Sequence, residues 1–373
     1  MSPPVAILGG GLSALVLGFE LLNQGVSGTD LILIDDSNER RGSNAPGALM
    51  HPFPGRSMSP SEDLHSIWSQ SLNFLNHLEL LRPGLSKSVP LLRPLGHPRG
   101  ERLEKSYWNH REQLESQFGV HYCTDPALHV RYPFLGECKT LLEIPKARHV
   151  NLPLLCQTLL EYLSAKGVRR VSGEVLRLTK REETWEIQTC TETVDARRVV
   201  FALGASLGQF FPKLQCVPTL GTLATIHWPN GPEPDFALSM GGHIAPLSDG
   251  EWILGATYHR PPYTLPSPEQ LATDLLAPLK LWVPGLENAT LLRTWSGFRG
   301  VLEPSRKPVC GPIPGLESCF VLGGFGSKGL LFVPALARQL ATTLVEGKPP
   351  VEPPLSPLNS PHKWLPSPDK IQP

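Results

Sequence analysis

Three small residues near the start of the chain have the spacing of a phosphate-binding turn. Gly9, Gly11 and Ala14 form a G-x-G-x-x-A pattern directly after the apolar run Val5–Leu8. The first glycine permits a tight turn, the second lets a pyrophosphate approach the backbone, and the small third residue lets a helix pack closely on a strand. The first N–H groups of that helix, and its dipole, favour an anion. The pattern predicts a dinucleotide site.

An acidic residue stands where such a site would bind a ribose. A second apolar run, Leu31–Ile34, ends on Asp35, about 20 residues after Ala14. A carboxylate there could accept hydrogen bonds from ribose hydroxyls. The alternative is an ordinary glycine turn that binds no ligand. On the first interpretation, the expected dinucleotide contacts here are Gly9, Gly11, Leu12, Ser13, Ala14, Asp35 and Asp36.

Two further loops have the composition of ligand-binding segments. Residues 42–49 read GSNAPGAL, which are small and polar enough to press against a ligand. Four glycines, at 323, 324, 326 and 329, separate an apolar run at 319–322 from an apolar helical pattern at about 330–344. A glycine-rich loop at a helix N-terminus could bind an anionic or electron-rich group. A plain turn in the first loop and a tight packing turn in the second are the alternatives.

The spacing of apolar residues predicts the elements that hold these loops. Helical periodicity is found at about 61–81, 101–118, 151–166, 268–282 and 330–344. The buried run Val199–Leu203 is expected to return as a strand to the sheet that begins with Val5–Leu8, and residues 219–258 alternate as antiparallel strands do. These patterns indicate an α/β fold, and 373 residues suffice for two interleaved domains.

Net charge and cysteine spacing narrow the classes of function. The chain has 34 Lys and Arg against 34 Asp and Glu, so the net charge gives no reason to expect nucleic acid or a membrane surface as a partner. Seven scattered cysteines contain no C-x-x-C pair, which indicates reduced thiols and no metal site. No apolar run reaches the roughly 18 residues of a membrane span, and the first strand begins too near Met1 for a signal peptide. We therefore expect a cytoplasmic protein whose proline-rich end, 349–373, is an extended appendage.

The separated motifs occur in an order typical of one family. They are G-x-G-x-x-A at 9–14, GSNAPGAL at 42–49, SGEVLRL at 172–178, VVFALGAS at 199–206, LGATYHR at 254–260, GFRGVLEPSRKPVCGPIPG at 297–315 and GGFGSKGL at 323–330. In these motifs the chain resembles the D-amino-acid oxidase/glycine oxidase (DAO) superfamily of flavoproteins across nearly its whole length. GSNAPGAL, LGATY and GSKGL are most similar to the FAD-dependent oxidoreductase domain of the bifunctional tRNA 5-methylaminomethyl-2-thiouridine biosynthesis protein.

The resemblance implies a fold and a division of the chain. A Rossmann-like FAD-binding domain would be interleaved with an α+β substrate domain that carries a large antiparallel sheet. The FAD-binding domain would take residues 1–84, 146–214 and 293–348. The substrate domain would take 85–145 and 215–292, and the proline-rich tail 349–373.

The resemblance also implies an amine oxidase reaction. A C–N bond next to a carboxylate would be oxidised by hydride transfer to FAD, the imine would hydrolyse, and molecular oxygen would reoxidise the flavin. The substrate would be a small-molecule amine acid, or carboxymethylaminomethyl-uridine at the wobble position of tRNA, which would release glyoxylate in a tRNA modification step.

Roles carry over from the family residue by residue. Val175 would meet adenine through its backbone, while Ala202 and Gly204 would close over the pyrophosphate. Arg299 would pair with the substrate carboxylate, since its fixed fork of donors suits two oxygens. The other expected catalytic residues are His243 and Tyr258. The residues expected to line or cap the flavin ring are Asn44, Gly47, Ala48, Leu49, Gly326, Ser327, Lys328, Gly329 and Leu330. The charge of Lys328 and the helix dipole would favour the anionic reduced ring.

The chain departs from the family at three points. His243 stands where members often carry Tyr, and a histidine could donate to a carboxylate or be structural. The usual Pro-Asp reads Pro304-Ser305, and no cysteine adjoins Arg299 in the sequence, which implies noncovalent FAD. Three functions are therefore open. The first is an oxidase of N-substituted glycines, with tRNA as one candidate substrate. The second is a small-molecule glycine or D-amino-acid oxidase, which the near-neutral charge favours. The third is a flavin-binding module without oxidase activity.

Overall fold

The computed structural model of the chain describes residues 4–55, 57–229, 231–248, 250–264, 266–347 and 364–372. The chain forms two compact units, each assembled from separate stretches of sequence. Unit 1 comprises Met1–Asn44, Pro153–Thr219 and Gly297–Pro373. Unit 2 comprises Ala45–Leu152 and Leu220–Ser296. The finer division into FAD-binding and substrate-binding segments stays a prediction, because it assigns a role to each segment.

Unit 1 is built on a six-stranded sheet that begins with the first apolar run. Val5 pairs with Leu31 on one side and with Arg198 on the other, so the strand expected to return to this sheet does so. All neighbouring strands are parallel except the edge pair of β19 and β20, which is antiparallel. The central strands are apolar throughout because a parallel sheet is covered on both faces. The order is β19 (Val309–Pro312), β20 (Cys319–Gly323), β13 (Arg198–Phe201), β1 (Val5–Leu8), β2 (Leu31–Asp35) and β9 (Arg169–Ser172).

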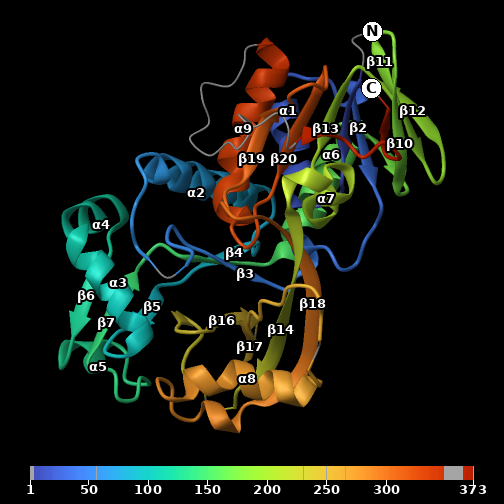
Figure 1. Cartoon of the computed structure of the whole chain (residues 1–373). Helices are drawn as coiled ribbons and strands as arrows, with labels where there is room; N and C mark the ends of the chain where they lie inside the picture. Colours follow the sequence, from blue (N-terminus) through green and yellow to red (C-terminus); the bar gives the residue numbers. More distant parts are fainter. Residues whose placement is uncertain are drawn as a thin grey trace. The chain divides into compact units, whose positions relative to one another are not determined.

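Three helices lie beside this sheet (Figure 1): α1 (Leu12–Asn23), α6 (Leu152–Ala165) and α9 (Gly329–Glu346). Helix α1 packs against α9, and a Cβ added at Gly18 of α1 would touch Leu163 of α6 at 3.0 Å. The close approach of these helices explains the small residue. One short helical turn, η1 (Gly28–Asp30), joins α1 to β2. The others come after β2 or β13: η2 (Gly42–Asn44), η3 (Gly204–Ser206), α7 (Leu207–Phe210) and η4 (Pro212–Leu214).

A second sheet of unit 1 includes the C-terminal segment of the chain. Its order is β12 (Thr193–Ala196), β11 (Thr184–Thr189), β10 (Val175–Arg181) and β21 (Ile371–Gln372). Residues 349–363 of the tail lie outside the described residues. The expectation of an appendage is wrong for 364–372, because Trp364 and Ile371 are each only 1% exposed and belong to the core of unit 1.

Unit 2 contains most of an eight-stranded sheet, as expected. From β14 to β6 the neighbouring strands are antiparallel, apart from the parallel pair β15 and β5. Two long strands also extend into unit 1, through Cys216–Thr219 and Gly297–Leu302. The order is β18 (Thr290–Leu302), β14 (Cys216–His227), β17 (Glu251–Gly255), β16 (His243–Ser248), β15 (Ala237–Ser239), β5 (Leu91–Pro94), β7 (Thr140–Ile144) and β6 (His121–Thr124).

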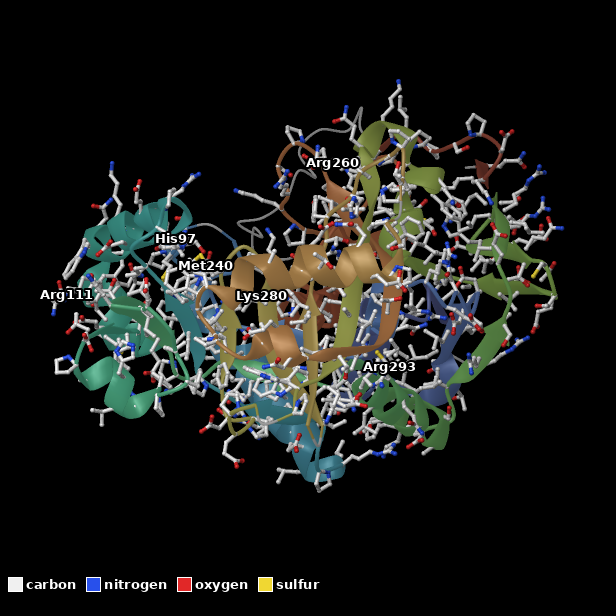
Figure 2. The ribbon with its side chains drawn as sticks, turned by 90° about the horizontal axis from the view of Figure 1, so that it is seen from below. His97, Arg111, Met240, Arg260, Lys280 and Arg293 are labelled. Carbon is white, nitrogen blue, oxygen red and sulfur yellow. The ribbon has the colours of Figure 1, made fainter. Side chains whose placement is uncertain are left out.

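The helices of unit 2 match the predicted ones with one correction. The single helix expected at 101–118 is two, because His110 leaves the helical region with φ −129° and ψ 20°. Arg111, labelled in Figure 2, begins the second of them and lies 5.5 Å from the ring of Trp108. The helices are α2 (Leu64–Leu81), α3 (Pro98–Asn109), α4 (Arg111–Phe118), α5 (Ala127–Arg131), α8 (Pro268–Lys280) and η5 (Leu286–Asn288). A small third sheet has the order β3 (Ala48–Met50), β8 (Arg148–Val150) and β4 (Ser86–Ser88).

The architecture therefore confirms the α/β class, with a Rossmann-like unit interleaved with an α+β unit that carries a large, mainly antiparallel sheet. All seven cysteines are free thiols, as their spacing indicated. Within the described ranges, none of the helices has the length and apolar character needed to cross a membrane.

Candidate functional site

The first glycine turn is shaped by its neighbours in unit 1. Gly9 has φ +120°, and its N–H donates to the Ile34 carbonyl at 2.7 Å. A Cβ on Gly9 would overlap the Ala202 carbonyl oxygen, and one on Gly10 would overlap the Asp35 carboxylate. Gly11 is different, since a Cβ there would meet only the Ser43 hydroxyl, at 3.2 Å. Gly9 and Gly10 are required for packing, whereas the space at Gly11 is open to a ligand.

Helix α1 begins with unsatisfied donors. Its N-cap is Gly11, which offers no side-chain cap, and its first turn contains no acidic residue. The first backbone bond of the helix runs from the Leu15 N–H to the Gly11 carbonyl at 3.1 Å. The N–H groups of Leu12, Ser13 and Ala14 thus have no acceptor within the helix. Orphaned donors beside an open glycine fit the pyrophosphate of a dinucleotide.

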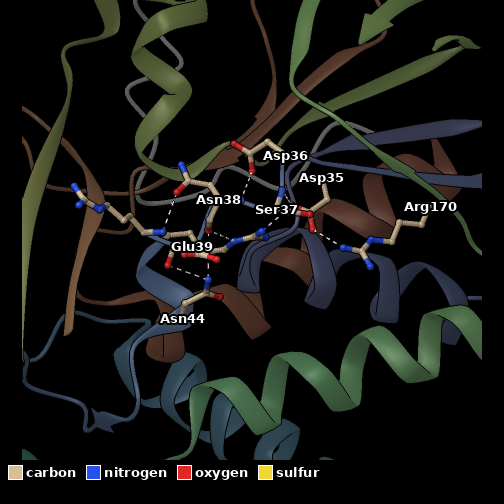
Figure 3. Close-up of polar contacts among 9 residues, drawn as sticks. Asp35, Asp36, Ser37, Asn38, Glu39, Asn44 and Arg170 are labelled. Carbon is tan, nitrogen blue, oxygen red and sulfur yellow. Dashed lines mark hydrogen bonds and ion pairs between the residues drawn. The ribbon is translucent and has the colours of Figure 1, made fainter. Parts of the chain in front are cut away.

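Asp35 is the centre of a charged cluster in unit 1 (Figure 3). Its carboxylate is 5% exposed and pairs with Arg41 at 2.9 Å and with Arg170 at 3.1 Å. The Ser37 N–H donates to the same carboxylate at 2.9 Å. Asp36 is exposed, and its carboxylate accepts from the Asn38 N–H at 3.1 Å. Asp35 is therefore held in a fixed position below the glycine turn, and its role at a ribose stays a prediction.

The loop that follows is tied to the strand that carries Arg299. The Phe298 N–H donates to the Arg40 carbonyl at 2.7 Å, and Arg41 forms a bridge with Phe298. A Cβ on Gly42 would lie 3.4 Å from Cγ of Arg299. Asn44 donates from its side-chain amide to the carbonyls of Asn38 and Glu39, so its side chain folds back on the loop (Figure 3). The structure thus brings Arg299 to the loop at 42–44.

The same strand reaches the second glycine-rich loop. A Cβ on Gly300 would overlap the Gly204 carbonyl, and the Gly326 N–H donates to the Gly300 carbonyl at 2.9 Å. Gly204 and Gly326 both have positive φ, of 54° and 57°. Gly300 therefore lies between two of the predicted cofactor loops, those of Gly204 and Gly326, and Arg299 is the residue directly before it.

Helix α9 starts without a side-chain cap and lies next to α1. Its first residue, Gly329, faces Leu12, since a Cβ on Gly329 would lie 3.7 Å from Leu12 Cδ2. Two helix N-termini with unsatisfied donors therefore adjoin each other within unit 1. Lys328, the N-cap of α9, donates from Nζ to the Arg306 carbonyl at 2.8 Å. Burial, followed by the charges of Arg306 and Lys307, lowers the pKa of Lys328.

The thiol of Cys216, which lies against Gly300, is not a nucleophile. A Cβ on Gly300 would lie 3.1 Å from Sγ of Cys216, and this thiol donates to the Gly204 carbonyl at 3.7 Å. Burial raises the pKa of Cys216 to about 12. A thiol that stays protonated does not attack a flavin ring.

In unit 2, the flavin-lining segment expected at 47–49 is paired with β8. Ala48 pairs with Val150 and Leu49 with His149. A Cβ on Gly47 would lie 2.5 Å from Nε2 of His149, so this ring lies directly against the glycine. His149 is 5% exposed, and its Nε2 has no partner in the described part of the chain. A buried ring nitrogen without a partner beside Gly47 is consistent with a ligand there.

His51 and His149 are two histidines of unit 2 that burial keeps neutral. Burial, then the charges of Arg93 and His243, lowers the pKa of His51 to about 3. Burial, then His243 and Lys87, lowers the pKa of His149 to about 4. Both rings are neutral at pH 7. The Phe53 N–H donates to Nδ1 of His51 at 3.3 Å, which places the proton of that ring on Nε2.

Arg93 is a buried cation of unit 2 that binds backbone. Its guanidinium donates to the carbonyls of Phe53 at 3.3 Å and Gly55 at 2.7 Å. Burial lowers the pKa of Arg93 to about 10, which leaves it charged at neutral pH. This arginine fixes the segment after His51.

The expected catalytic residues are distributed over both units. Arg299 is in unit 1, while His243 and Tyr258 are in unit 2. His243 begins β16 and is paired with Ser239 and Gly255. Its ring lies over Gly255, where a Cβ would be 3.3 Å from Cε1 of His243. Tyr258 is 44% exposed and follows β17. Their joint action on one substrate stays a prediction.

The sequence patterns did not predict several residues that position the candidate site. Arg41 and Arg170 hold Asp35, and Gly300 contacts the Gly204 turn. Two local signals could have indicated them: the basic pair Arg40-Arg41 shortly after Asp35, and the glycine directly after Arg299. The pairing of His149 with Leu49 offered no such signal, because it joins residues about 100 positions apart.

The remaining predicted cofactor residues lie in unit 1. Val175 begins β10 and is buried, and the Val175 carbonyl accepts from Lys370 at 3.4 Å. Ala202 directly follows β13, and its N–H donates to the Leu8 carbonyl at 2.9 Å. Ser327 precedes the N-cap of α9, and Leu330 is buried in its first turn.

Comparison with known proteins gives a family match along most of the chain. Residues 4–343 match the family described as FAD dependent oxidoreductase (DAO). Glycine oxidase of Pseudomonas putida is 25% identical over 366 residues, which cover 94% of this chain and 96% of that protein. The tRNA 5-methylaminomethyl-2-thiouridine biosynthesis bifunctional protein MnmC of Maricaulis maris is 33% identical over 156 residues. That match covers 42% of this chain and 25% of the bifunctional protein.

The crystal structure of iminodiacetate oxidase from Chelativorans sp. BNC1 has the same fold. It superposes with a TM-score of 0.77 at 20% identity and covers 94% of this chain and 97% of that one.

Proposed function

The chain belongs to the DAO family of FAD-dependent oxidoreductases, and from that premise we propose that it oxidises the C–N bond of an N-substituted glycine or a related amino acid. Bound FAD supplies a hydride acceptor for this reaction. The uncapped N-terminus of α1 and the open space at Gly11 fit its phosphates, and the uncapped N-terminus of α9 suits the flavin ring assigned to it. The alternative of a flavin-binding module without catalysis is not retained, because the family and the similar proteins are oxidoreductases.

The observation that carries the proposal is the position of Arg299 in unit 1. Its strand contacts the 42–44 loop through Gly42, the Gly204 turn through Gly300, and the second glycine-rich loop through Gly326. A guanidinium among the predicted cofactor loops suits a carboxylate, because it donates two parallel hydrogen bonds. We assign Arg299 to the substrate carboxylate, which would hold the neighbouring Cα–H bond toward the flavin.

The neutral histidine His149 of unit 2 supports the choice of an amine substrate. A hydride leaves the carbon next to an amine only when the nitrogen has a free electron pair, so the substrate must lose its ammonium proton. His149, which lies against Gly47, is uncharged at neutral pH, so it provides no anion beside this predicted flavin-lining glycine that would stabilise an ammonium. We assign His243 and Tyr258 to the substrate side of the site.

The overall reaction balances with water and oxygen. The substrate R–NH–CH2–COO⁻ loses a hydride from carbon and a proton from nitrogen, and the resulting imine adds water and separates into R–NH2 and glyoxylate. Molecular oxygen then takes the two electrons and forms hydrogen peroxide. FAD is held without a covalent bond, because the thiol near Arg299, Cys216, stays protonated.

A tRNA substrate is the second candidate, and one observation favours it. The 156 residues shared with the bifunctional tRNA protein are 33% identical, a higher figure than the 25% shared with glycine oxidase. The even balance of 34 basic and 34 acidic residues speaks for the small substrate, because tRNA binding usually relies on a basic face.

Anaerobic flavin bleaching separates these candidates. The purified protein is mixed without oxygen with glycine, sarcosine, iminodiacetate, D-alanine or unfractionated tRNA, and the loss of flavin absorbance is followed. We expect sarcosine or iminodiacetate to bleach the flavin fastest. Bleaching by tRNA alone would transfer the proposal to the tRNA candidate, and bleaching by none of the five would contradict both.

Acid precipitation of the protein tests whether FAD is held without a covalent bond. It should leave the yellow colour of the flavin in the supernatant.

A further inference from the structure

The C-terminal segment Trp364–Gln372 lies against the strand that carries Val175. The carbonyl of Lys370 accepts from the Leu178 N–H at 2.8 Å, and β21 continues as a parallel neighbour of β10. In Figure 1 this segment is the short red stretch beside β10. The C-terminus thus adds an edge strand to the sheet that begins with Val175.

Apolar anchors fix this segment to unit 1. Trp364 is 1% exposed, and its ring centroid lies 5.3 Å from that of Phe211. The Ser367 N–H donates to the Phe210 carbonyl at 2.9 Å. Ile371 is 1% exposed and faces the same core. Buried contacts on both sides of Lys370 therefore determine where its side chain begins.

The Lys370 ammonium meets the first residues of β10. Nζ donates to the Val175 carbonyl at 3.4 Å and lies 3.6 Å from the Glu174 carboxylate. It also lies over the ring of Phe210, 5.5 Å from the centroid. The Lys370 side chain is 23% exposed, so water screens these interactions only in part. The backbone carbonyl, the carboxylate and the aromatic ring together restrict where this ammonium can lie.

Val175 needs this support because the strand is irregular there. The pairing of β10 with β11 shifts its register between Val175 and Arg177, which is the signature of a bulge. Leu176, between them, is 39% exposed. The preceding segment is held by the Gly173 N–H, which donates to the Asp35 carbonyl at 2.9 Å. Lys370 binds the peptide on the other side of this segment.

We propose that Lys370 is a positioning residue for the adenine end of FAD, which acts by holding the Val175 peptide in place. This inference rests on the proposed function and on the role assigned to Val175 within it. A carbonyl oxygen has two lone pairs, so the Val175 carbonyl can accept from Lys370 and from an adenine amine together. A backbone fixed before binding loses less entropy when the cofactor binds.

The test compares FAD release from four holoenzymes: wild type, Lys370→Met, Lys370→Arg and Lys180→Met. Methionine keeps the aliphatic stem over Phe210 and removes the donor, whereas arginine keeps a donor and the charge. Lys180 is the matched control, because it lies on β10 over the ring of Trp185 at 5.6 Å, in the same sheet. Release is followed after dilution as the rise in free-flavin fluorescence.

We expect Lys370→Met to release FAD about fivefold faster or more, since the lost donor weakens binding by about 1 kcal/mol or more. Lys370→Arg and Lys180→Met should stay within about twofold of the wild type. Release from Lys370→Met within twofold of the wild type, or equal acceleration in Lys180→Met, would overturn the assignment. A protein that never contains flavin would instead contradict the proposed function.

Discussion

The backbone N–H of Gly326 donates to the carbonyl of Gly300 at 2.9 Å. Gly300 also abuts the Gly204 carbonyl so closely that no Cβ fits there. One strand position thus separates the two turns to which pyrophosphate and flavin contacts are assigned, and the residue before it is Arg299. Binding of FAD and placement of Arg299 therefore depend on the same backbone, although they use different atoms.

Gly11→Val should remove FAD without unfolding the protein. A Cβ at this position would meet only the Ser43 hydroxyl of the protein, at 3.2 Å, and the valine side chain would occupy the space assigned to the pyrophosphate. We expect flavin content to fall below about a tenth of the wild-type value, because a clash that costs about 1.4 kcal/mol already weakens FAD binding tenfold. Flavin absorbance per protein and a urea unfolding curve are the two measurements.

Gly10→Ala is the matched control for that experiment. A Cβ there would overlap the Asp35 carboxylate, so the folded protein itself must shift. We expect its free energy of unfolding to fall by about 1–3 kcal/mol, while Gly11→Val unfolds near the wild-type midpoint. Full flavin content in Gly11→Val would show that the phosphates bind elsewhere.

Asp35→Asn should destabilise unit 1. The substitution removes the charge that pairs with Arg41 and Arg170, and it leaves a buried site with two guanidinium groups. Because Arg170 is 41% exposed in its side chain, water compensates part of the loss. We expect a decrease in the free energy of unfolding of about 1–3 kcal/mol. Asp36→Asn, next to it and exposed, should change this free energy by less than about 0.5 kcal/mol. Equal effects of the two variants would exclude the charged cluster as a structural element.

The stability of the protein should fall as the pH drops from about 6.5 toward 4. In the unfolded chain a histidine takes up a proton near pH 6.5, whereas the folded pKa is about 3 for His51 and about 4 for His149. Between these values the unfolded state binds more protons, so acid favours unfolding, and above about pH 6.5 the two groups contribute no slope. Each contributes about 1.4 kcal/mol per pH unit at most.

His149→Asn should remove the share of His149 from this pH dependence. Urea unfolding at several pH values between 4 and 7 measures it. His121→Asn is the control, because His121 is exposed on β6. If His149→Asn and the wild type show the same dependence on pH, His149 is not a buried neutral group.

Local patterns in the sequence predicted the elements of unit 1 well. The glycine spacing and the apolar runs predicted β1, the start of α1 and β2 within a residue or so, because these signals act between near neighbours in the chain. The split at His110 was missed, since the apolar spacing continues through it.

Long-range pairings explain what the sequence could not predict. The tail was expected to be an appendage because Trp364 and Ile371 stand alone in a proline-rich stretch, and only their partners on β10 and Phe211 make them core residues. The same applies to His149 against Gly47, and to the arginines that hold Asp35. Each depends on a partner far away in the chain, which no local pattern specifies.

The most direct measurement is anaerobic reduction of the flavin in Arg299→Ala by the best amine acid found with the wild type. Losing one partner of a buried charge pair costs about 2 kcal/mol or more, so at low substrate concentration the reduction should be roughly 30-fold slower or more. Arg299→Lys should lose less, because it keeps the charge without the bidentate fork. The control is Arg293→Ala. Arg293, labelled in Figure 2, lies on the same strand and pairs with Glu251 on the surface. The flavin of this variant should be reduced at the wild-type rate. All variants should retain FAD. Equal reduction rates in Arg299→Ala and the wild type would contradict the account.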